Sequence, residues 1–256
     1  MQALPVSVQR ILVFFVIAIV VSNVFRFELF GIGEWLGQFP AEIQVILKVL
    51  LEGSGVFIGA LVGRYQLRKT RKIEMTLGGT SPQRALLMSV IPLVLVSVIG
   101  VKNGWDIQPN AYGLLAVVGS LIYCIMEEYG WRGYLQEELR DLKPWKRYLL
   151  IGFLWYFWHL SFLGNATPYE NLFFLAMLIL GSWGIGEVAH TTRSIVASAC
   201  FHLIIQLMLF NSLIKNGLDN TQKFIVLGLT VLLWIIILER WKKADKHRLN
   251  QEKSAD

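Results

Sequence analysis

The chain has 256 residues, of which 55% are hydrophobic and only 16% are charged, against about 25% charged residues in an ordinary soluble domain. This composition excludes a disordered chain, and two cysteines in 256 residues exclude a scaffold held by disulfide bonds. We therefore expect one integral membrane domain that extends over residues 1–256.

Apolar runs close to the length that crosses a bilayer recur along the whole chain. The predicted fold is an all-α polytopic bundle of about eight transmembrane helices, and an even number of spans places both ends of the chain on one side. The predicted spans cover residues 11–24, 43–62, 85–101, 112–132, 148–162, 172–188, 195–210 and 224–238.

The net charge of +6 is distributed unevenly over this topology. Basic residues gather in segments that share a side with the two ends, such as 64–72, 140–147 and 240–253, whereas few lie on the other side. The excess predicts that both termini are cytoplasmic, and the compact chain favours a bacterial cytoplasmic membrane. Because topology and anionic lipid account for the charge, we expect the lipid bilayer as a partner and no nucleic acid.

Ionisable residues inside the predicted spans are the candidate functional groups, because a charge in the bilayer is costly unless it is paired or faces a cavity. Lys48 and Glu52 lie four residues apart, so they are predicted to pair on one helical face. Glycines at positions 55, 59 and 63 of the same helix predict close contact with a neighbouring helix. We interpret this helix as a packing element.

Glu127 and Glu128 are adjacent, so their side chains point in directions about 100° apart on a helix. Glu128 is spaced to pair with Arg132, whereas Glu127 needs a partner from another helix. The spacing alone allows two interpretations. Either Glu127 is an acid–base group and Glu128 supports it, or both glutamates form purely structural pairs.

His159 and His202 lie on two further predicted spans, at a depth broadly similar to that of Glu127. Either histidine alone is typical of a satisfied core residue, but together with Glu127 they predict one buried polar site in the cytoplasmic half of the bundle. A carboxylate and an imidazole can deprotonate water, while a second imidazole and the amide of Gln206 can donate to an oxyanion. One Glu and two His also form a zinc ligand set known from peptidases.

The segment Glu-Glu-Tyr-Gly-Trp-Arg at residues 127–132 resembles the Glu-Glu-x-x-x-Arg motif of the CAAX protease and bacteriocin-processing family, also called the Abi family. His159 matches the second motif, aromatic-x-x-x-His, and residues 192–202 resemble the approach to the third. The similarity covers about residues 113–212. It implies an intramembrane endopeptidase of the glutamic type, related to the type II CAAX prenyl endopeptidases.

The resemblance also implies the roles of individual residues. Glu127 would be the general base, His159 would help to activate the water, and His202 with Gln206 would form the oxyanion hole. Glu128 and Arg132 would support the site.

No cofactor is expected from the glutamic reading, although members of the family were long labelled metalloproteases. If zinc is bound, its ligands would be Glu127, His159 and His202. The chain departs from the usual motifs at Trp155, where Phe is usual, and at Gln206, where Asn is usual. We interpret the first change as conservative and expect the second to move the amide donor by one methylene.

The expected substrate is a membrane-associated or lipidated peptide or protein. Two other functions stay open at this point. One is a non-catalytic bacteriocin-immunity or partner-binding membrane protein of the same fold. The other is a transporter that relays protons through buried Glu and His residues, for which we expect broken helices or an inverted repeat. The sequence leaves the oligomeric state undetermined.

Overall fold

The computed structural model describes residues 8–67, 74–159, 166–209, 213–214 and 216–255, and every regular element in these parts is a helix. The all-α prediction is therefore confirmed. Eight helices correspond to the eight predicted spans: α1 (Val8–Arg26), α3 (Ala41–Leu61), α4 (Pro82–Ile99), α5 (Pro109–Gly130), α6 (Pro144–Trp158), α8 (Pro168–Thr192), α9 (Ile195–Leu209) and α10 (Asn220–Ala255). Four short elements accompany them: η1 (Leu29–Gly31), α2 (Ile32–Leu36) and the π-helical segments η2 (Val62–Gln66) and η3 (Trp131–Gln136).

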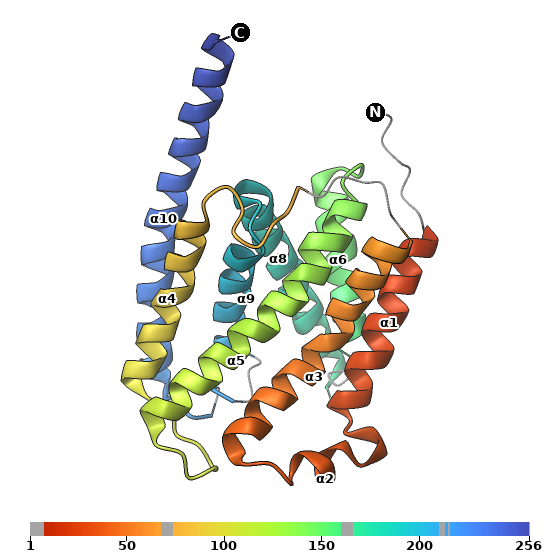
Figure 1. Cartoon of the computed structure of the whole chain (residues 1–256), viewed down its shortest axis with the longest axis vertical. Coiled ribbons are helices and arrows are strands. Elements are labelled where there is room, and N and C mark those ends of the chain that lie inside the picture. Colours follow the sequence, from red (N-terminus) through yellow and green to blue (C-terminus); the bar gives the residue numbers. More distant parts are fainter. Residues whose placement is uncertain (1–7, 68–73, 160–165, 210–212, 215, 256) are drawn as a thin grey trace.

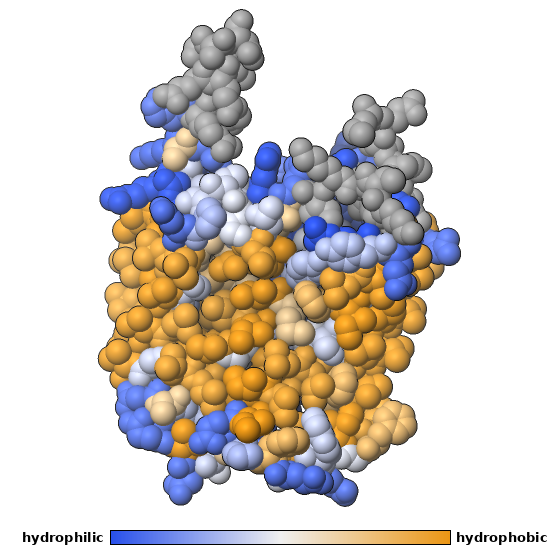
Figure 2. Space-filling model, viewed as in Figure 1, coloured by the Kyte–Doolittle hydropathy of each residue, from blue (hydrophilic) through white to orange (hydrophobic). Residues whose placement is uncertain are grey.

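Six of these helices are long and apolar enough to cross a membrane, so the chain is an integral membrane protein. Figure 2 shows a broad apolar band between hydrophilic residues at both ends of the molecule. α6 and α9 have only 15 residues each within the described parts, and the predicted span ends at Phe162 and Phe210 lie outside the described residues. α1 begins and α10 ends on the same side of the bundle (Figure 1).

α5 occupies the middle of the bundle, which it crosses obliquely, and it packs against α3, α4 and α9 (Figure 1). One group of buried apolar residues joins α5 to α4, α9 and α10. A second group joins α1, α3, η3, α6 and α8. Residues near the junction of α5 with η3 therefore lie between two apolar cores, where polar side chains have to find partners within the protein.

The α1–α3 contact depends on glycine, as the four-residue spacing predicts. A Cβ atom on Gly55 would overlap Ser22, and one on Gly59 would approach the Phe14 carbonyl oxygen to 2.8 Å. Gly130 has the same function between α5 and α3, because a Cβ atom there would overlap Val56. The second half of α3 therefore lies close to α1 on one side and to the Glu-Glu end of α5 on the other.

The start of α9 is held by the loop that precedes α4. Ser194 accepts a hydrogen bond from the Ala197 backbone through its hydroxyl (3.1 Å), and Thr76 forms a bridge with Ser194. Gly79 adopts a left-handed φ of +64° directly against the Thr192 carbonyl, where a Cβ atom would collide. These contacts fix the α8–α9 turn and, through it, the position of α9.

The prediction that Lys48 pairs with Glu52 is wrong, because Lys48 pairs with a different carboxylate. Among the described residues, the ion pair of Lys48 is with Glu28, at 3.2 Å between Nζ and Oε1. Glu28 follows the end of α1 in a left-handed conformation (φ 50°), and both side chains of the pair are about half exposed. The flexible side chain of Lys48 reaches the Glu28 carboxylate at the end of the bundle, which is more exposed than that of Glu52.

Candidate active site

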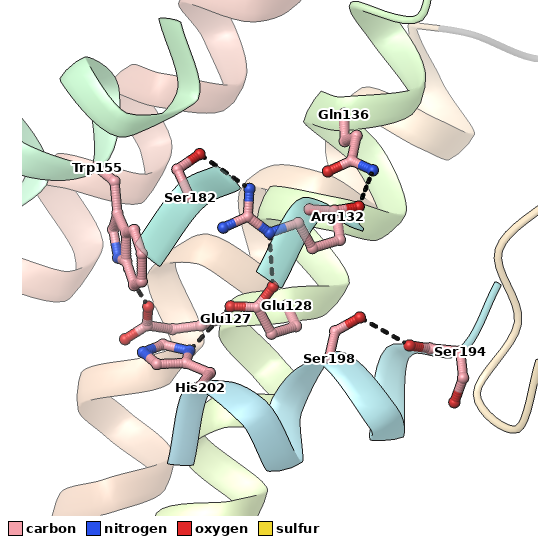
Figure 3. Close-up of polar contacts among 10 residues, drawn as sticks. Glu127, Glu128, Arg132, Gln136, Trp155, Ser182, Ser194, Ser198 and His202 are labelled. Atoms are coloured by element: carbon pink, nitrogen blue, oxygen red, sulfur yellow. Dashed lines mark hydrogen bonds and ion pairs between the residues drawn. The ribbon is translucent and has the colours of Figure 1, made fainter. Parts of the chain in front are cut away.

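Glu128 lies at the centre of a buried ion-pair network near the end of α5. Its carboxylate contacts Arg132 Nε at 2.9 Å and His202 Nδ1 at 2.8 Å, through different oxygens. Glu128 and Arg132 are fully buried, and His202 is 3% exposed. The predicted Glu128–Arg132 pair is thus confirmed, and the network extends from α5 to α9 (Figure 3).

Arg132 and Gln136 lie on the π-helical segment η3, one turn apart, and both face α8. Arg132 Nη1 donates to the Ser182 hydroxyl (3.3 Å), and Gln136 Nε2 donates to the Gly186 carbonyl (3.2 Å). The spacing of four residues is the same on both elements, so the two contacts align η3 with α8. π-Helical segments inside longer helices occur frequently at functional sites.

Glu127 is fully buried and accepts a hydrogen bond from the indole nitrogen of Trp155, at 3.1 Å. The Trp155 ring also meets His202 edge-on, with 4.9 Å between ring centroids. Figure 3 shows Trp155, Glu127 and His202 converging from three helices. The interpretation of Trp155 as a conservative replacement is therefore wrong, because phenylalanine has no N–H to offer this carboxylate.

His159 is the first residue after α6, whereas the sequence predicts it inside a span that continues to residue 162. Its backbone leaves the helix with φ −83° and ψ 57°, and its Nδ1 lies 2.9 Å from the Trp155 carbonyl oxygen. Because a carbonyl only accepts, Nδ1 carries the proton of this contact. In a neutral ring Nε2 is then the acceptor. The ring lies 4.6 Å from that of Trp158 and 6.0 Å from that of Trp155.

Gln206 lies one turn beyond His202 on α9 and is half-buried. Its side-chain oxygen lies 3.5 Å from the thiol of Cys124, one turn before Glu127 and Glu128 on α5. With the oxygen facing the thiol, the amide nitrogen is the remaining donor group of this side chain.

The structure therefore joins the six predicted site residues in three ways. Glu128, Arg132 and His202 touch directly. Glu127 and His159 both contact Trp155, and Gln206 is linked to α5 through Cys124. Within the described parts of the chain, no group of three or more His, Cys, Asp or Glu side chains is placed to hold a metal ion, so Glu127, His159 and His202 do not form such a group there.

Two contributors to the site were missed from the sequence: the indole N–H of Trp155 and the hydroxyl of Ser182. The sequence did contain a hint of the first. Glu127 has no local partner and so needs a hydrogen-bond donor, and the N–H of a buried tryptophan usually finds an acceptor. Ser182 gave no comparable signal, because small hydroxyl residues are common at helix contacts in membranes.

Comparison with known proteins agrees with the sequence motifs. Residues 109–208 match the family described as type II CAAX prenyl endopeptidase Rce1-like. Over 99 residues the chain is 31% identical to a CAAX prenyl protease 2 from Methanococcus maripaludis, and the alignment covers 34% of this chain and 36% of that protein. The chain thus matches about a third of the length of this relative. The resemblance is confirmed: residues 109–208, which contain all six predicted site residues, are similar to the type II CAAX prenyl endopeptidase family.

Proposed function

We propose that the protein is an intramembrane endopeptidase that hydrolyses a peptide bond in a membrane-associated or lipidated peptide or protein. The observation that carries the proposal is the different environment of two adjacent buried carboxylates. Glu128 is compensated by Arg132 and His202, whereas the hydrogen bond to Glu127 comes from the neutral indole of Trp155. Such a difference suits one carboxylate for support and the other for proton transfer.

In the proposed reaction, Glu127 takes a proton from water while the water oxygen forms a bond to the scissile carbonyl carbon. His159 orients the water through Nε2, since its Nδ1 faces the Trp155 carbonyl. The proton then passes from Glu127 to the amide nitrogen as the carbon–nitrogen bond breaks. A new carboxyl group and a new amine are the products, so no other reactant is needed.

His202 and Gln206 are the proposed donors to the oxyanion that forms on the carbonyl oxygen. With Nδ1 of His202 against Glu128, its Nε2 can donate only when the ring is an imidazolium. Glu128 is then the counter-ion of this ring as well as of Arg132. This arrangement gives Glu128 and Arg132 supporting roles without contact to the substrate.

The proposed orientation places both termini in the cytoplasm, in a bacterial cytoplasmic membrane, so that substrate enters from the cytoplasmic leaflet. Two facts support it: α1 begins and α10 ends on the same side (Figure 1), and basic residues gather in segments on that side. Labelling of single cysteines placed near residues 8 and 245 in intact cells tests it, because a membrane-impermeant reagent should reach neither.

The direct test is cleavage of a quenched lipidated-peptide library by purified protein in detergent. Glu127→Gln keeps an oxygen for the Trp155 indole but cannot accept a proton from water, so we expect it to abolish cleavage. Glu239→Gln is the matched control, because Glu239 is an exposed carboxylate on α10. Full cleavage by Glu127→Gln would contradict the proposed mechanism.

Two further measurements separate the other candidate functions: cleavage in the presence of a chelator, and cleavage of the library by the wild type. Cleavage that resists chelation fits a glutamic protease, whereas loss on chelation would show that a metal ion takes part and would make Glu127, His159 and His202 the ligands to test by mutation. No cleavage of a broad library by the wild type favours the non-catalytic immunity or partner-binding role, or transport.

A further inference from the structure

Arg26 is the last residue of α1 and lies outside the family-matched segment, yet its guanidinium reaches the site. One nitrogen donates to the Tyr123 hydroxyl (2.8 Å) and another donates to the Trp158 carbonyl (3.2 Å). The guanidinium carbon also lies 3.6 Å from the centre of the Trp158 ring. Two hydrogen bonds and one cation–π contact therefore hold this half-buried side chain in one place.

The contact with Tyr123 leads to the proposed general base. Tyr123 precedes Glu127 by one turn of α5, so the two side chains lie on the same side of that helix. One oxygen of the buried Glu127 carboxylate has no hydrogen-bond partner among the described residues. Because that hydroxyl already accepts a hydrogen bond from Arg26, its own proton is free to be donated. Arg26 thus directs the Tyr123 proton away from α1, and the unpartnered oxygen of Glu127 is an acceptor on the same side of α5.

The contact with Trp158 leads to the proposed water-orienting histidine. Trp158 is the last residue of α6, where carbonyl groups lack partners within the helix. Arg26 satisfies the Trp158 carbonyl, which belongs to the peptide bond that enters His159. The direction in which His159 leaves the helix therefore depends on a cation supplied by α1.

We propose that Arg26 is a positioning residue of the active site, which sets the distance between Glu127 and His159 by holding Tyr123 and the Trp158 carbonyl at once. This inference rests on the proposed function. The role needs a planar fork that donates in two directions while one face lies on an aromatic ring. A lysine ammonium lacks that geometry.

A purely structural arginine would affect folding alone, and the same helix offers a control of that kind. Arg10 lies on α1 and pairs with the buried Glu138 at 2.8 Å, away from the residues that contact Arg26. Arg10→Met should therefore reduce the resistance of the protein to unfolding and leave kcat per folded molecule unchanged.

The experiment compares full-length Arg26→Lys, Arg26→Met, Tyr123→Phe and the Arg26→Met/Tyr123→Phe double variant. The substrate is the peptide that the wild type cleaves best in the library. We expect Arg26→Met to lower kcat on the order of 100-fold, as for a misplacement of about 1 Å, with KM changed less than about threefold. Arg26→Lys should not restore the rate. Tyr123→Phe should lower kcat on the order of tenfold, with little further effect in the double variant.

Wild-type kcat in folded Arg26→Lys or in Tyr123→Phe overturns the inference, and these two variants serve even if Arg26→Met fails to fold. If Glu127→Gln is inactive in the same series, the proposed function stands while the role of Arg26 falls. If Glu127→Gln is fully active, both fall, because there is then no base to position. Equal losses for Arg10→Met and Arg26→Met would also contradict the inference.

Discussion

Two pairs of opposite charges have the same four-residue spacing in the sequence, and the structure forms only one of them. Glu128 and Arg132 are fully buried and pair as predicted. Lys48 instead contacts Glu28, and these side chains stay 46% and 47% exposed. A buried charge has to be compensated by the nearest opposite charge, whereas at an exposed end water competes and small differences decide. Helical spacing therefore gave the pair in which both partners are fully buried, and failed where the lysine is half exposed and has a second carboxylate within reach.

The largest effect is expected from Glu128→Gln, which breaks the buried network at its centre. Arg132 would keep its charge without a carboxylate, and such uncompensated burial costs about 3–5 kcal/mol. Unfolding in mixed micelles measures the loss, and a peptidase assay should show no activity. A loss below about 1 kcal/mol would mean that the network does not hold the bundle together.

Arg132→Lys should have a smaller effect, because the charge is kept and only the fork is lost. A lysine cannot reach both Glu128 and Ser182 with fixed geometry. We expect a loss of about 1.5–3 kcal/mol, the value of a charge-assisted hydrogen bond, in the same unfolding assay. Ser182→Ala should reproduce only part of this loss. If it has the larger effect, the contact with α8 matters more than the ion pair.

Trp155→Phe removes one donor from Glu127 and keeps an aromatic ring. A hydrogen bond to a charged group contributes about 1.5–3 kcal/mol, so we expect kcat to fall on the order of tenfold or more. Trp234→Phe is the matched control, because it removes a buried indole hydrogen bond to the Met88 carbonyl that does not involve Glu127. Equal kcat in both variants would show that Glu127 does not need the indole.

Lys48→Met should have the smallest effect. Exposed ion pairs contribute less than about 1 kcal/mol and weaken with salt, so unfolding should change little and kcat should stay unchanged. A large loss of stability in low salt would show that the exposed pair with Glu28 holds α3 to the end of α1. The contrast between the two pairs would then be smaller than their exposures indicate.

The eight helices and the buried ion pair of Glu128 with Arg132 could be predicted, because long apolar runs and charges inside them are strong signals. The end of α6 at Trp158 could not, since it depends on contacts made by Arg26 and His159 that have no local pattern. The donor from Trp155 also escaped prediction, because the sequence does not say which face of an aromatic helix meets Glu127. Lys48 was assigned to the wrong partner, because Glu28 becomes its neighbour only when α1 and α3 fold together.

The indole of Trp158 donates to the backbone carbonyl of Ala18 on α1, at 3.1 Å. This bond connects the family-matched segment to a helix that lies outside it. The matched segment is therefore not a transplantable module. Grafted behind a different first helix, it would lose the Ala18 carbonyl acceptor at the position that the Trp158 indole needs. Among related sequences, residues near positions 18–26 should therefore covary with residues near positions 155–159, although well over a hundred positions separate them in the chain.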